Sequence, residues 1–277
     1  MSKISAAQVN ELRKRTGAGM MDCKKALVET EGDFEKAIDI LRKKGQKLAS
    51  SRSDRAATEG VVLSTTNDAK DKAYAIMLNC ETDFVAQNKD VIDFTETILT
   101  QAVKNDCATL DELKNLTMEG RKVEEHVTDM IGKTGEKMEI GSYEMVAGQR
   151  AFAYTHPGNK IASIAALNKA DVNDLDTIGK DVVMQIAAMA PVALDKDQVP
   201  QDVIDRELEI GKDQARQEGK PEELLEKIAA GKLNKFFKES TLINQEFIKD
   251  NKKSVGQMLK AADNELTVVE FKRLSLV

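Results

Sequence analysis

The apolar residues change their spacing near Gly60, and this change limits the possible folds more than any other feature. Before Gly60, short segments repeat their apolar residues with a helical period, as Phe34, Ala37 and Leu41 do. After it, apolar runs bounded by turn residues begin at 60–64 and have the length of strands. We therefore predict an α+β fold that starts with a separate helical domain, over residues 1–54.

The N-terminal domain is predicted to contain three short helices, over about 5–16, 21–29 and 34–41. A domain of this size has little core to bury and is better suited to docking than to catalysis. The basic stretch Arg42–Arg55 that follows is poor in apolar residues and is predicted to be a linker. An RNA-contacting arm is the alternative, which we disfavour because no aromatic residue interrupts the charges.

The rest of the chain divides into two α+β halves, 55–147 and 148–277. Each half shows two strands, a helix and a final strand, although the sequence similarity between the halves does not establish a repeat. The second half also contains a pair of very polar helices, within about 195–238, whose apolar seam is too narrow to cover a sheet. We expect that pair to project as an antiparallel helical hairpin. The other predicted elements are strands at 60–64, 73–78, 136–146, 151–156, 161–167 and 266–271, and helices at 89–104, 119–131, 175–189 and 254–260.

Composition excludes several classes of protein. The 41 basic and 47 acidic residues give a net charge of −6, which argues against broad nucleic-acid binding. No apolar run reaches the roughly 18 residues that span a membrane, and no signal peptide is recognised, so we expect a cytoplasmic protein. The cysteines Cys23, Cys80 and Cys107 form no CxxC pair and are interpreted as buried apolar residues.

The sequence shows no catalytic constellation. It has two histidines, and His126 lies in a charged helical segment typical of a surface. Gly132-Lys133-Thr134 resembles the end of a phosphate-binding loop, but Val127 stands where that motif needs glycine. We therefore predict no enzyme activity, no cofactor and no metal site.

Two segments suggest partner binding instead. Met20 and Met21 are adjacent, and a core this small cannot bury both; either one packs inside or both form an adaptable contact surface. In the second segment a strand ends, Thr82 can cap a short helix, and Asp83 lies in its first turn, where we expect it to hold the tip by hydrogen bonds. Phe84 follows, and on these residues alone a core position is favoured over an exposed one.

These segments resemble the bacterial elongation factor Ts family, the guanine-nucleotide exchange factors of elongation factor Tu. The resemblance rests on Arg15–Leu27 and on Thr82–Val85. Shorter matches in the family's order extend it over nearly the whole chain: Gly219-Lys220-Pro221, Gly231-Lys232-Leu233 and Ser254-Val255-Gly256-Gln257.

The resemblance implies a ubiquitin-associated-like N-terminal domain, two α+β subdomains and an inserted helical arm. It also implies binding to elongation factor Tu in its GDP-bound and nucleotide-free states. Arg13, Met20 and Met21 match docking positions of the family. Thr82, Asp83, Phe84 and Val85 match a wedge that enters the partner near its magnesium and phosphate site, and His156 falls near a further contact.

The resemblance implies no direct contact with nucleic acid or membrane, and it leaves open a homodimer through the helical hairpin. Two other readings stay open on the residues. A protein-binding adaptor would bind through Met20 and Met21 without affecting nucleotide. An enzyme with an unrecognised site would be active without a GTPase, but the chain lacks clustered His, Cys or paired carboxylates.

Overall fold

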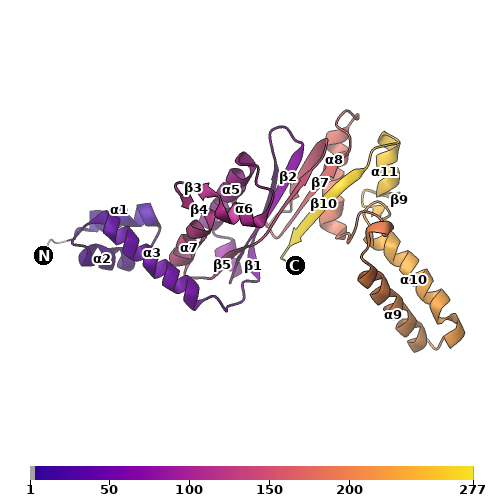
Figure 1. Cartoon of the computed structure of the whole chain (residues 1–277), viewed down its shortest axis with the longest axis horizontal. Coiled ribbons are helices and arrows are strands. Elements are labelled where there is room, and N and C mark those ends of the chain that lie inside the picture. Colours follow the sequence, from indigo (N-terminus) through magenta and orange to yellow (C-terminus); the bar gives the residue numbers. More distant parts are fainter. Residues whose placement is uncertain (1–3, 277) are drawn as a thin grey trace. The chain divides into compact units, whose positions relative to one another are not determined.

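The computed structural model describes residues 4–276, which combine helices with small sheets (Figure 1). This mixture confirms the predicted α+β class. The chain forms two compact units. The first holds the residues up to Leu63, Ile76–Glu144 and the chain end from Leu274; the second holds Ser64–Ala75 and Met145–Arg273. The finer division at residues 54 and 147 stays a prediction.

The first unit begins with three helices around a small core: α1 (Ala6–Thr16), α2 (Met20–Glu29) and α3 (Phe34–Ser51). Ser5 caps α1 reciprocally with Gln8, and Gly17 ends it at φ 68°, a left-handed conformation that glycine adopts without strain. The core residues are Val9, Leu12, Ala18, Cys23, Ala26, Leu27 and Ala37. The three predicted helices are thus present, and Cys23, Cys80 and Cys107 are all buried, as interpreted.

The prediction of a linker over Arg42–Arg55 is wrong for most of its length, because α3 continues to Ser51. The apolar stripe of the helix continues through Leu41, Gly45 and Leu48, while the intervening basic residues are exposed. Gly45 is buried, and there α3 packs against α7 (Val123–Thr134). A basic exposed face and an apolar inner face are compatible in one helix.

The rest of the first unit consists of a three-stranded sheet of order β1-β2-β5 and the helices and short strands between β2 and β5. A short β3–β4 hairpin, with positive φ at Glu119 and Gly120, occupies the start of the predicted 119–131 helix, so α7 begins only at Val123. The 89–104 helix is confirmed, and α6 was not predicted. The elements are β1 (Glu59–Thr66), β2 (Lys72–Cys80), α4 (Asp83–Ala86), α5 (Lys89–Lys104), α6 (Leu110–Asn115), β3 (Thr117–Met118), β4 (Arg121–Lys122) and β5 (Met138–Ala147).

The second unit contains a sheet of order β10-β7-β6 that packs with α8 and α11 around one apolar core. The strands predicted at 151–156 and 161–167 are confirmed as β6 and β7, which pair antiparallel with Phe152 opposite Ala165. The β8–β9 hairpin was not predicted, because it is short and its second strand is charged. The elements here are β6 (Arg150–Thr155), β7 (Ile161–Leu167), α8 (Leu175–Met189), β8 (Glu246–Phe247), β9 (Asp250–Ser254), α11 (Val255–Ala262) and β10 (Val268–Ser275).

Two further helices of this unit, α9 (Gln201–Gln217) and α10 (Leu225–Ser240), pack side by side (Figure 1). Gly211 lies against Ala229, and a Cβ atom built on Gly211 would sit 3.1 Å from the Ala229 Cα. The narrow seam of small residues therefore brings the two backbones close together. No helix among residues 4–276 has both the length and the apolarity needed to cross a membrane.

Candidate functional site

The segment Thr82–Val85, here called the wedge segment, follows the last residues of β2 and forms the start of α4. Phe84 is 84% exposed, the most exposed of the large apolar side chains noted among residues 4–276. The core position that the residues alone favoured is therefore wrong. Asp83 is exposed, Val85 is half-buried, and Ala86 is buried beneath them. The segment presents a large aromatic side chain that contributes nothing to the core.

Thr82 fixes the base of this segment. Its hydroxyl caps α4 by accepting from the Val85 amide at 3.4 Å, and its carbonyl accepts from the Ala86 amide and from the Cys80 thiol. The Thr82 amide and hydroxyl both donate to the Glu136 carboxylate, at 3.0 and 2.7 Å. The predicted cap at Thr82 and the predicted place of Asp83 in the first turn are confirmed, and the role of Asp83 in holding the tip stays a prediction. Every polar group of Thr82 is thus engaged, so its backbone is fixed in place.

Glu81, the residue before the wedge segment, accepts three hydrogen bonds. The donors are the Arg52 guanidinium at 2.7 Å, the Arg55 guanidinium at 2.9 Å and the Lys137 amide at 2.6 Å. The Lys137 ammonium group in turn donates to the Arg55 carbonyl at 3.1 Å. The Lys137 amide, followed by the two arginines, lowers the pKa of Glu81 to about 2. The carboxylate is therefore ionised over the whole physiological range.

Cys80 lies directly before Glu81 and Thr82 and is buried. Burial, followed by the negative charge of Glu136, raises the pKa of the Cys80 thiol to about 11. A thiol in this state is a poor nucleophile. Cys80 therefore supports the wedge segment as a packed residue and hydrogen-bond donor and not as a reactive group.

The predicted docking residues lie on the first two helices. Met20 is 50% exposed and Met21 61% exposed, so the reading in which one of them packs inside is wrong. Both stand at the start of α2, directly after the Gly17–Gly19 loop, while Cys23, Ala26 and Leu27 supply its buried face. Arg13 is exposed near the end of α1. The three helices thus expose two flexible apolar side chains and a basic one, and their docking role stays a prediction.

His156 belongs to the second unit and is exposed just beyond the end of β6. Its Nδ1 atom is 2.8 Å from the Tyr154 hydroxyl, and the two rings meet edge to face with centroids 5.9 Å apart. Because the tyrosine occupies Nδ1, the Nε2 atom is the ring nitrogen left for an external contact.

A family model described as elongation factor TS matches residues 81–276. A protein of Cytophaga hutchinsonii named elongation factor Ts is 51% identical over 277 residues, which cover 100% of both chains. A protein of the same name from Porphyromonas gingivalis is 49% identical over 274 residues, covering 99% of this chain and 98% of the other. This chain belongs to the elongation factor Ts family. A third family member, from Chlorobium phaeobacteroides, is 41% identical over 286 residues, so the likeness to elongation factor Ts covers both compact units.

The sequence did not predict two residues that hold the wedge segment, Glu81 and Glu136. Glu136 lies 54 residues after Thr82, and nothing in the order of the residues pairs them. Gly135, which ends α7 in a left-handed conformation, is the one signal that the chain turns there. Among the described residues, no group of three or more His, Cys, Asp or Glu side chains is arranged to hold a metal ion.

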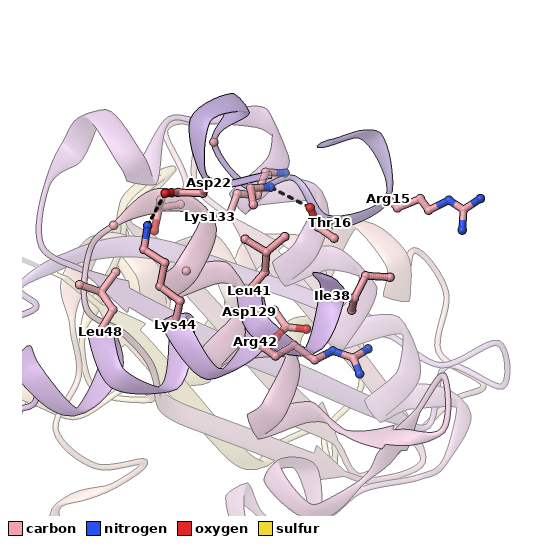
Figure 2. Close-up of a pocket in the computed structure, with 16 residues that line it drawn as sticks. Arg15, Thr16, Asp22, Ile38, Leu41, Arg42, Lys44, Leu48, Asp129 and Lys133 are labelled. Atoms are coloured by element: carbon pink, nitrogen blue, oxygen red, sulfur yellow. Dashed lines mark hydrogen bonds and ion pairs between the residues drawn. The ribbon is translucent and has the colours of Figure 1, made fainter. Parts of the chain in front are cut away.

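A hollow of about 500 Å³ opens between the Gly17–Gly19 loop, α3 and α7 (Figure 2). Its lysines are already paired with carboxylates: Lys44 with Asp22 at 2.5 Å, and Lys133 with Asp90 at 2.7 Å. Its arginines also have acidic neighbours, Glu11 for Arg15 and Asp39 for Arg42. The cationic side chains that line the hollow therefore all have acidic partners within the chain.

Proposed function

We propose that this protein promotes the release of GDP from elongation factor Tu, so that GTP can bind. The proposal rests on its membership of the elongation factor Ts family and on one observation, the exposure of Phe84 on a rigidly capped segment. A large aromatic side chain that lies exposed on a capped segment and is unused by the core is the kind of residue that dominates binding to a partner.

The proposed mechanism needs no chemical catalysis by this chain. A tightly bound nucleotide leaves slowly because its phosphates and magnesium ion are held together, and the magnesium belongs to the partner. The factor binds a conformation in which that hold is broken. Linkage makes the effect reciprocal, because nucleotide weakens factor binding by the same ratio as the factor weakens nucleotide binding. Each tenfold weakening corresponds to about 1.4 kcal/mol of coupling free energy.

Each part of the chain has a proposed role in this mechanism. Phe84 enters between helices of the partner near the nucleotide, with Thr82 and Val85 shaping its base and Asp83 beside it. Met20 and Met21, with Arg13, supply docking affinity and contribute less to nucleotide release once the complex has formed. His156 makes a separate contact from the second unit.

The finer features of the fold enter the proposal as well. We propose that α1–α3 form a domain of the ubiquitin-associated type and that α9 and α10 form a projecting arm, with a homodimer through that arm as one further use. Contact with nucleic acid or a membrane has no role in the proposed cycle, which takes place in the cytoplasm.

The test is the release of fluorescent GDP from purified elongation factor Tu in excess unlabelled GDP, with and without this protein. We expect strong acceleration by the unaltered chain. Phe84→Ala should lower the acceleration by about 30-fold, since truncating a dominant contact residue costs about 2 kcal/mol or more. Leu224→Ala is the matched control, because Leu224 is also an exposed apolar residue but lies on the turn before α10.

Two outcomes would contradict the proposal in different ways. If Phe84→Ala weakened binding but left nucleotide release from the bound complex unchanged, Phe84 would be an anchor and not a wedge. If the unaltered chain bound elongation factor Tu without accelerating release, the protein would be an adaptor.

A further inference from the structure

The carboxylate of Glu81 joins two parts of the first unit that carry different proposed roles. In the chain, Glu81 directly precedes the wedge segment. Its carboxylate binds the guanidinium groups of Arg52, directly after α3, and of Arg55, three residues further on. The α3 helix packs against α2, which carries Met20 and Met21. A continuous path of packed helix and hydrogen bonds therefore runs from the docking residues to Glu81, the residue directly before the wedge segment.

A second connection between α3 and the rest of the first unit lies in the middle of α3, at Gly45. Gly45 of α3 meets Gly132 of α7, and a Cβ atom on Gly132 would sit 3.2 Å from the Gly45 Cα. The next residue, Lys133, lies across the Gly17 turn; a Cβ atom on Gly17 would be 2.7 Å from its Cδ. The Lys133 ammonium group binds Asp90 in the first turn of α5, at 2.7 Å. Figure 2 shows Lys133 among the residues that line this side of α3 and α7.

We infer that Glu81 is a positioning residue, which holds α3 and the docking residues in a fixed place relative to Phe84 through Arg52 and Arg55. Its effect on nucleotide exchange rests on the proposed function, but its effect on the geometry of the free chain does not. The Glu81 side chain is only 14% exposed, so it acts through its three donors and not by touching a partner.

Fixing the two surfaces relative to each other matters because they would act on one partner. Once Met20 and Met21 have docked, a rigid connection presents Phe84 at a high effective concentration in one orientation. If the connection is loosened, the wedge segment must be ordered again after docking, and that ordering opposes its insertion. Loosening the connection does not change the affinity that Met20 and Met21 supply for docking. The expected signature is slower release at saturating factor, with the half-saturating concentration nearly unchanged.

The test variant is Glu81→Gln, which keeps the size and shape of the side chain but removes the charge that attracts both arginines. The matched control is Asp176→Asn. Asp176 also accepts from a guanidinium, that of Arg150 at 2.6 Å, but this pair joins β6 to α8 within the second unit. Circular dichroism melting curves check that both variants fold.

The direct readout is the distribution of distances between two nitroxide labels in the free protein, measured by pulsed electron paramagnetic resonance spectroscopy. The labels are placed at the exposed positions Lys25 on α2 and Gln87 at the end of α4, each changed to cysteine. The three native cysteines are buried, which disfavours their labelling in the folded protein. We expect one narrow distribution for the parent and for Asp176→Asn, and a clearly broader one for Glu81→Gln. An unchanged, narrow distribution in Glu81→Gln would overturn the inference.

The functional readout is nucleotide release from elongation factor Tu at saturating concentrations of each variant. We expect Glu81→Gln to be about threefold to tenfold slower than the parent, the range for one ordering step moved into binding. A broad distribution with undiminished release would refute the link between geometry and exchange. If the parent itself gave no acceleration, the proposed function would fail, whereas the label distances would still decide whether Glu81 positions the two surfaces.

Discussion

Two glycines inside helices, Gly45 in α3 and Gly231 in α10, provide a matched test of the crossing between α3 and α7. Both stand well within their helices, so alanine improves the helix propensity of each by a similar amount, about 0.8–1.0 kcal/mol. Their surroundings differ. Nothing lies within 4 Å of a Cβ atom on Gly231, whereas a Cβ on Gly45 would meet the Thr128 carbonyl oxygen at 3.3 Å and the Gly132 Cα at 3.5 Å.

The expected changes in stability follow from these distances. Gly231→Ala has only the propensity term and should raise the free energy of unfolding by about 1 kcal/mol. Gly45→Ala has the same gain, but its methyl group presses on the backbone of α7, and overpacking of this kind costs about 1–3 kcal/mol. The net effect of Gly45→Ala should therefore lie between about zero and a loss of 2 kcal/mol. Adding Gly132→Ala should worsen Gly45→Ala by more than its own effect, because the two methyl groups would meet.

The assay is urea denaturation followed by circular dichroism, combined with amide hydrogen exchange that reports each helix separately. Local exchange is needed because Gly45 and Gly231 lie in different compact units. If Gly45→Ala stabilised its helix as much as Gly231→Ala does, the backbones of α3 and α7 would not touch in solution. The connection between the docking helices and the rest of the first unit would then rest on Glu81 alone.

Three further predictions concern other contacts. The lowered pKa of Glu81, about 2, means that its contribution to stability is complete above the usual carboxyl pKa and is lost as the pH falls toward 2; an acid titration of Glu81→Gln should lack this loss. Gly211→Ala should loosen the α9–α10 pair, seen as faster amide exchange in both helices, because its Cβ would sit 3.1 Å from the Ala229 Cα. Ser254→Ala should lower stability by about 1 kcal/mol in urea titrations, since it removes the reciprocal cap with Gln257 at the start of α11.

The sequence predicted the elements whose signals are local. The three N-terminal helices, the strands at 151–156 and 161–167 and the 175–189 helix all depend on neighbouring residues, and all are present. The extension of α3 was missed because its exposed face is basic, and that charge hid an apolar stripe ending in glycine and leucine. A glycine on such a stripe carries no apolar signal, although here it marks the closest approach to α7.

The exposed residues of the candidate site could be predicted from the sequence, but the residues that hold them in place could not. The methionines could be singled out because a small core cannot bury both, and Phe84 because it matches a family pattern, whereas composition and spacing alone favoured a buried Phe84. The carboxylates that hold Thr82 and the arginines could not be found, since each pairing joins residues 26 to 56 positions apart. Such pairings depend on the completed fold, which brings the end of β2 beside the start of β5.

Because Phe84 is exposed, the residues that stabilise the fold differ from the residue proposed to carry the exchange activity. A side chain that is 84% exposed can be replaced with little change in melting temperature, expression or resistance to proteolysis. Screens that select variants by folding would therefore accept chains that have lost the proposed exchange activity. The same separation leaves the tip free to follow changes in the surface of its partner, because natural selection can alter it without disturbing the scaffold beneath.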